Sequence, residues 1–197
     1  MGQYYIPVNL DKSQWLYSHD YKNRWKRSED GQIFITGQGL KLMEHSYIGN
    51  KFVEAVENLL IPGGSWYKNK LVWAGDYADE EPNTITKDNP KGRNLYEIIG
   101  IDENKIKPKA KKLPKKYRYV CNHDKKEFTD KEKIAADKDG FKIHPLPLLT
   151  CEGNGRGGGD FYGDDERIGR WARDRISIES EVPNGFTEID GLFVEDI

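Results

Sequence analysis

The sequence has no long hydrophobic run and few cysteines. No apolar stretch in its 197 residues approaches the roughly 20 residues that a membrane-spanning helix needs. The start, MGQYYIPVNL, has neither the basic region nor the apolar run of a signal peptide. We therefore expect a cytoplasmic protein that makes no contact with membranes, in which Cys121 and Cys151 stay reduced.

An excess of one charge and the common catalytic motifs are also missing. The chain has 31 basic and 33 acidic residues, so no global field attracts nucleic acid or an anionic membrane. It contains no Cys-x-x-Cys or His-Glu-x-x-His pattern, no Gly-x-Ser-x-Gly nucleophile elbow and no phosphate-binding loop that ends in Lys-Ser/Thr. These absences predict no cofactor and no metal, and they favour a protein that is not an enzyme.

What the sequence does contain is a pair of similar halves. Four anchors align in the same order: residues 4–15 on 117–128, 30–31 on 139–140, 42–43 on 148–149, and 65–73 on 170–178. The offset drifts from 113 through 109 and 106 to 105, as two copies separated by small deletions would give. The last anchor pairs Trp66 with Trp171, which we expect to be buried in equivalent positions. The alignment predicts a pseudo-symmetric body with a cleft between the copies.

The predicted fold class is α+β, with two related antiparallel β units packed face to face or side by side. The first unit covers residues 1–81, a connector rich in proline and lysine covers 82–116, and the second unit covers 117–197. One clear amphipathic helix is expected in the first unit over residues 51–60, with Asn50 as its N-cap. Strands are expected as a hairpin over residues 4–17 and at 32–36, 40–44 and 66–73.

The second unit repeats the hairpin and the tryptophan strand. In place of the helix, the alignment puts a glycine-rich block, residues 153–163. The sequence His-Pro-Leu-Pro over residues 144–147 predicts an extended, proline-fixed entry into the apolar pair that follows. Because divergence is concentrated at the glycine-rich block, we expect this block to have a separate role.

Five glycines in this block surround an arginine, a composition typical of a backbone nest that binds a phosphate or a carboxylate. The predicted ligand-binding residues are Gly153, Asn154, Gly155, Arg156, Gly157, Gly158, Gly159 and Asp160. The alternative is a loop whose glycines permit left-handed turns or close packing against the other copy.

A His/carboxylate cluster is the candidate for catalysis. The pair Glu44 and His45 aligns with Thr150 and Cys151, so only one copy could use it in acid–base or metal chemistry. Asp76 follows the tryptophan strand and completes the candidate set. The alternative is that these polar residues only position strands and loops.

The connector contains a lysine-rich segment, residues 105–116. Its lysines could contact nucleic acid: Lys105, Lys107, Lys109, Lys111, Lys112, Lys115 and Lys116. No aromatic residue lies among them to stack on bases, which favours a solvated, stiffened linker over a nucleic-acid arm.

Several segments of the sequence are distinctive: the start MGQYY with VNLDK, then KLMEHSYIGN, WAGDYADE, HPLPLLT with EGNGRGGGDF, and the W-A-R-D-x-I-S-I run. Together they resemble an uncharacterised family of bacterial and bacteriophage proteins. The resemblance covers most of the chain outside the connector. It implies a prokaryotic or phage origin and a cytoplasmic setting, and it implies no reaction.

Two functional hypotheses follow from the sequence. The first is a non-enzymatic binding or inhibitory module, such as a phage or prophage accessory factor that acts on a host protein or an anionic, nucleotide-like ligand. The second is a metal-dependent hydrolase or nuclease that uses Glu44, His45 and Asp76.

Overall fold

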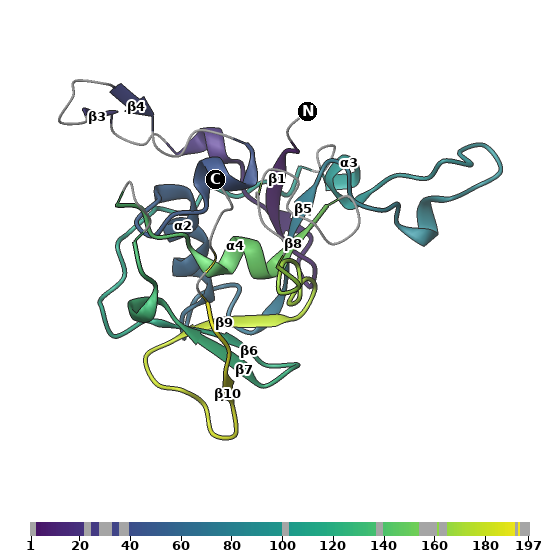
Figure 1. Ribbon diagram of the computed structural model, residues 1–197. Helices are drawn as coiled ribbons and strands as arrows, with labels where there is room; N and C mark the ends of the chain where they lie inside the picture. The colour runs from purple at the N-terminus through teal and green to yellow at the C-terminus, as the bar shows by residue number, and fades with distance from the viewer. Residues whose placement is uncertain are drawn as a thin grey trace.

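The computed structural model describes residues 3–21, 25–27, 33–35, 40–99, 103–136, 140–153, 161, 165–191 and 193 (Figure 1). Within these residues the fold has one eight-stranded sheet, a separate two-stranded sheet and four α-helices. Only α2 (Lys51–Leu60) among these helices is long, with ten residues. The predicted α+β class, with one clear helix in the first half, is confirmed.

Most of the elements are short. The strands are β1 (Tyr5–Asn9), β2 (Gln14–Trp15), β3 (Trp25–Arg27), β4 (Ile33–Ile35), β5 (Asn69–Gly75), β6 (Tyr119–Asn122), β7 (Glu127–Asp130), β8 (Cys151–Glu152), β9 (Arg175–Glu179) and β10 (Thr187–Glu188). The other helices are α1 (Leu42–His45), α3 (Leu95–Ile99) and α4 (Pro145–Thr150). No helix of the described residues is long and apolar enough to cross a membrane.

Two antiparallel groups of three strands make up most of the large sheet. The strand order is β10-β7-β6-β9-β5-β1-β2, and β8 pairs in parallel with β5. The group β2-β1-β5 comes from the first half of the chain, and the group β7-β6-β9 comes from the second. They meet where β5 and β9 pair antiparallel, with Lys70 opposite Arg175. The two units therefore lie side by side in one continuous sheet.

The two groups use the same local backbone conformations at positions that the sequence alignment pairs. Each hairpin turn is closed by the side chain of an asparagine, and the residue before its second arm has positive φ, at Ser13 and at Lys126. A second matched pair, Lys68 and Arg173, has positive φ just before β5 and β9. Since this backbone conformation is unfavourable for residues other than glycine, its recurrence at matched positions indicates the same chain path in both groups.

The junction between β5 and β9 is itself nearly symmetric. The Lys68 amide donates to the Ile176 carbonyl over 3.1 Å, and the Arg173 amide donates to the Leu71 carbonyl over 2.8 Å. The alignment pairs Lys68 with Arg173 and Leu71 with Ile176, so each bond is the counterpart of the other. The register pair named above lies between these bonds, and a local two-fold axis passes through it. Descent of the two units from one duplicated ancestor stays a prediction of the alignment.

The two aligned tryptophans occupy equivalent, fully buried positions. The Trp66 indole N–H donates to Gln14 Oε1 over 2.9 Å, and the Trp171 indole N–H donates to Glu127 Oε2 over 2.8 Å. Gln14 and Glu127 are themselves aligned, because each begins the second arm of its hairpin. The predicted equivalence of the two tryptophans is confirmed.

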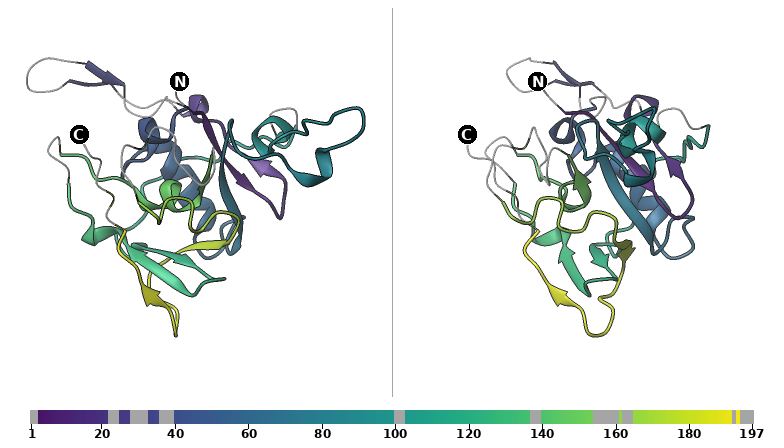
Figure 2. Two further views of the ribbon diagram at one scale, coloured as in Figure 1. Left: turned by 45° about the vertical axis from the view of Figure 1, so that its right-hand side comes forward. Right: turned by 90° about the vertical axis from the view of Figure 1, so that its right-hand side faces the viewer.

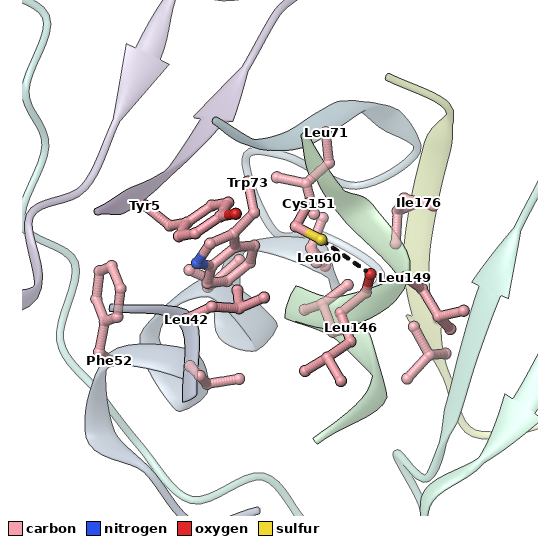
Figure 3. Packing of buried hydrophobic residues seen from close by; sticks show 14 of the residues in the cluster. Tyr5, Leu42, Phe52, Leu60, Leu71, Trp73, Leu146, Leu149, Cys151 and Ile176 are labelled. Atoms are coloured by element: carbon pink, nitrogen blue, oxygen red, sulfur yellow. Dashed lines mark hydrogen bonds between the residues drawn. The ribbon is translucent and has the colours of Figure 1, made fainter. Parts of the chain in front are cut away.

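The main core lies between the sheet and the helices α2 and α4 (Figure 3). Alternate residues of the central strands face it, among them Tyr5, Leu71 and Trp73, because successive side chains of a strand point to opposite faces. Cys151 lies in this core, and its thiol donates to the Leu148 carbonyl over 3.2 Å. Both cysteines are buried and unbridged, as expected.

The second unit also contains a helix, so the prediction of an extended His-Pro-Leu-Pro segment was wrong. His144 caps α4 by accepting from the Leu146 amide, just as Asn50 caps α2. Prolines at the first and third positions of α4 are tolerated because amides of the first turn have no partner within the helix. The tryptophan amides bond back to the last full turn of each helix, at Leu59 and at Leu149. The glycine-rich block therefore follows this helix and does not replace it.

Two smaller expectations also need correction. The strand predicted over residues 40–44 is mostly the short helix α1, whose Glu44 side chain accepts from the Lys41 amide. The strand predicted over residues 66–73 begins only at Asn69, and Trp66 lies in the turn before it. In the connector, residues 82–94 form an arm that projects from the body (Figures 1 and 2).

Replacing each tryptophan by phenylalanine tests the matched contacts. Trp171→Phe is expected to cost more stability than Trp66→Phe, since hydrogen bonds to charged groups contribute about 1.5–3 kcal/mol and those to neutral groups about 0.5–1.5 kcal/mol. Urea denaturation measures both free energies of unfolding, with the exposed Tyr4→Phe as control. Equal losses, or a larger loss for Trp66→Phe, would contradict the assignment.

Candidate functional site

A cleft of about 490 Å³ opens between α2 and the chain that enters the second unit. Its walls come from both units and from the connector: Ile48, Gly49, Glu54, Glu57, Lys112, Leu113, Pro114, Lys115, Tyr117, Arg118, Lys131, Glu132 and Lys142. A cleft between the units, as the alignment predicts, is therefore present. Its volume lies within the range of sites for small molecules, about 300–1,000 Å³.

The acidic residues of the cleft are paired, whereas three of its lysines are not. The ion pairs are Lys51–Glu54, Lys131–Glu57 and Arg118–Glu132. Lys112, Lys115 and Lys142 are exposed and have no ion-pair partner within the part of the chain that the structure describes. The rim of the cleft is therefore positive, which favours an anionic ligand.

A buried polar group forms the floor of the cleft. The carboxylate of Glu57, on α2, accepts from the Lys131 ammonium and lies 3.0 Å from His144 Nε2. Burial alone would raise the pKa of Glu57, but Lys131 and His144 outweigh it and hold this pKa at about 2. Burial lowers the pKa of His144, which is only 1% exposed.

The hydrogen bonds of His144 determine which ring nitrogen carries the proton. Nδ1 accepts from the Leu146 amide over 3.1 Å, so it has no proton of its own. Nε2 then donates to Glu57, and the imidazole is neutral. Because both ring nitrogens are engaged, His144 has no free position for proton transfer to a ligand in the cleft.

The lysine-rich segment, residues 105–116, lies against the body of the protein; we call it the strap. The Ile106 amide donates to the Trp15 carbonyl over 2.9 Å, the Tyr21 hydroxyl donates to the Pro108 carbonyl over 3.0 Å, and the Asn58 side-chain amide donates to the Lys111 carbonyl over 2.6 Å. Three apolar residues of the strap pack against the main core: Ile106, Ala110 and Leu113. The strap is therefore fixed along the first unit and is more than a solvated linker.

Of the predicted glycine-rich site, only Gly153 lies within the described residues. The other seven, Asn154, Gly155, Arg156, Gly157, Gly158, Gly159 and Asp160, lie outside them. A Cβ atom added to Gly75, at the end of β5, would meet the Cα of Gly153 at 3.2 Å. Asp76 follows directly, so the start of the predicted loop lies near one residue of the predicted His/carboxylate cluster.

The structure does not join Glu44, His45 and Asp76 into one group. His45 is fully buried, and its Nε2 accepts from the Trp73 indole N–H over 2.9 Å. Glu44 is exposed, and Asp76 Oδ1 accepts from the Tyr4 amide over 2.9 Å. Across the described ranges, no three His, Cys, Asp or Glu residues are arranged to hold a metal ion. The hydrolase hypothesis stays an untested prediction and would need ligands from other residues.

A polar cluster on the opposite face of the sheet was not anticipated from the sequence. His123 Nε2 lies 2.7 Å from Ser177 Oγ, which donates to Glu179 Oε1 over 2.7 Å. The Tyr67 hydroxyl donates to the same carboxylate oxygen over 2.9 Å. Burial and the negative charge of Glu179 raise the pKa of Cys121 to about 12, so its thiol stays protonated.

This polar cluster occupies positions that are apolar in the first unit. The alignment pairs Cys121, His123, Ser177 and Glu179 with Val8, Leu10, Val72 and Ala74. Those four residues belong to a small apolar cluster that includes Leu95 and Ile99 of α3. The polar cluster could have been predicted from this pattern, in which polar residues of the second half align with apolar residues of the first at alternate positions of the strands.

No protein-family model, curated protein or solved structure gives a significant match to this chain. The assignment of function therefore depends on the geometry described above.

The floor of the cleft is expected to make stability fall in acid. The folded-state pKa of His144 lies below its ordinary value of 6.5, so the unfolded chain takes up the proton first and stability decreases as the pH falls below about 6.5. The pKa of Glu57 is about 2 in the folded state against an ordinary 4.5, so its contribution is lost as the pH falls from about 4.5 towards 2.

His144→Asn separates these two contributions, since asparagine already caps α2 in the same way. The free energy of unfolding is measured from pH 8 to pH 3. We expect the variant to lack the decrease below about pH 6.5 that the natural protein shows, and to retain the decrease below about pH 4.5. An unchanged profile would show that His144 is not held neutral by its surroundings.

Proposed function

We propose that this protein is a non-enzymatic binding module that holds an anionic ligand of nucleotide size in the cleft between α2 and the strap. The observation that carries the proposal is the charge pattern. The acidic residues that line the cleft have basic partners, and Lys112, Lys115 and Lys142 have none among the described residues. A phosphate or carboxylate on this rim meets uncompensated ammonium groups and no unpaired carboxylate.

An apolar wall beside these lysines supports a ligand with a planar or apolar part. Leu113 and Tyr117 are half-buried, and Ile48 remains 38% exposed. The Lys116 ammonium lies 5.1 Å from the centre of the Tyr117 ring. Small-molecule sites commonly combine such apolar surface with a few charged groups that orient the ligand. A nucleotide or an aromatic carboxylate therefore fits this cleft better than an inorganic ion.

The polar groups near the cleft support binding and not catalysis. A general base needs a free lone pair within reach of its substrate. Both nitrogens of His144 are engaged, and the pKa of Glu57, about 2, makes its carboxylate a weak base. An accessory role toward a host protein, which is part of the first hypothesis from the sequence, stays a further prediction.

Charge reversal at the rim tests the proposal. Calorimetric titration with nucleoside mono- and triphosphates and with aromatic carboxylates is expected to show binding that Lys115→Glu combined with Lys142→Glu weakens more than tenfold. The reason is that each contact to a charged group contributes about 1.5–3 kcal/mol.

Lys87→Glu is the matched control, because Lys87 is also exposed and lies on the projecting arm, outside the cleft. Circular dichroism of the variants establishes that they fold. Binding that both variants weaken equally, or the absence of binding by every anion in the series, would refute the proposal.

A further inference from the structure

The strap presents its lysines to solvent in a regular pattern. From residue 105 to residue 111 every second residue is an exposed lysine, and the residues between them are half-buried against the body. This alternation is that of an extended chain, in which alternate side chains lie about 6–7 Å apart on one face. The lysines therefore form a row along the outer face of the strap.

The row of lysines continues into the cleft, and only its first two members lie near an acidic side chain. Lys105 and Lys107 lie 3.1 Å and 3.8 Å from the carboxylate of Asp20. Beyond them, six lysines have no ion-pair partner in the described ranges, and we call them the basic track: Lys109, Lys111, Lys112, Lys115, Lys116 and Lys142. Since residues 105–116 contain no acidic residue, nothing within the strap neutralises this track.

The fold places aromatic rings at both ends of the strap. At its beginning, the Lys105 ammonium lies 5.9 Å from the centre of the Tyr17 ring, and the His19 ring lies 5.0 Å from that of Tyr17. At its end, Tyr117 forms part of the cleft wall. The absence of aromatics within the segment, which disfavoured nucleic acid, is therefore compensated by residues from elsewhere in the chain.

We propose that the ligand of the basic track is a single-stranded nucleic acid, whose backbone follows the strap and one of whose nucleotides enters the cleft. This inference rests on the proposed function and names its substrate class. Lysines in a row match a chain of phosphates. The exposed His19 ring and the half-buried rings of Tyr17 and Tyr117 lie at the two ends of the row, where unpaired bases can stack on them. An acidic peptide would use the lysines and leave the rings without a role.

The experiment is fluorescence anisotropy with labelled oligothymidylates and a labelled mononucleotide. Oligomers of roughly 4, 8 and 12 nucleotides are expected to bind progressively more tightly than the mononucleotide, because longer strands reach more of the track. The double variant Lys109→Gln with Lys111→Gln changes only exposed, unpaired residues outside the cleft. It is expected to reduce the slope of log affinity against log salt by about 1.4, since each phosphate contact contributes about 0.7.

The outcomes separate this inference from the proposed function. If the mononucleotide binds and longer strands bind no more tightly, the proposed ligand site in the cleft stands. The proposal that a nucleic acid follows the basic track is then refuted. Polyglutamate that competes as well as an oligomer of equal charge would assign the track to an acidic protein segment and overturn the inference. A salt slope unchanged in the double variant, with Lys87→Gln as control, would overturn it as well. Failure of every phosphate ligand to bind would refute the proposed function, in which the cleft holds an anionic ligand.

Discussion

The antiparallel junction of β5 and β9 is the interaction on which the rest of the structure depends. It joins two three-stranded groups into one sheet, so both contribute to a single core under α2 and α4. The bonds made by Lys68 and Arg173 on either side of the axis need left-handed backbone at both residues. Such backbone is unfavourable for lysine and arginine, and the paired strands on each side hold it in place.

The backbones of the two units are nearly symmetric, but the side chains on one face of their sheet differ. On the core side, both units use a capped helix and a buried tryptophan. On the other side, α3 covers an apolar cluster in the first unit, whereas the second unit has the polar cluster around Ser177 and Glu179. The cleft forms where the connector crosses from one unit to the other. Its unpaired lysines come from the strap, which lies between the units, and from Lys142 of the second unit.

Interactions between neighbours in sequence were predictable. The hairpin and helix α2 with its Asn50 cap follow from local patterns. The equivalence of the tryptophans follows from the alignment of the two halves. Helix α4 was missed because its prolines are acceptable only in the first turn, where amides are free in any case. The positive charge of the cleft could not be predicted, because it depends on which acidic residues find partners in the fold. The glycine-rich residues 154–160 lie outside the described residues, so their predicted role stays open to test.

The central claim is that the strap and the cleft form one anion-binding surface. Chemical-shift mapping of the labelled protein during titration with an eight-nucleotide oligothymidylate tests it most directly. We expect the largest changes at the amides of residues 109–117 and of Lys142. Changes confined to the polar cluster around His123, or to the projecting arm, would contradict the account.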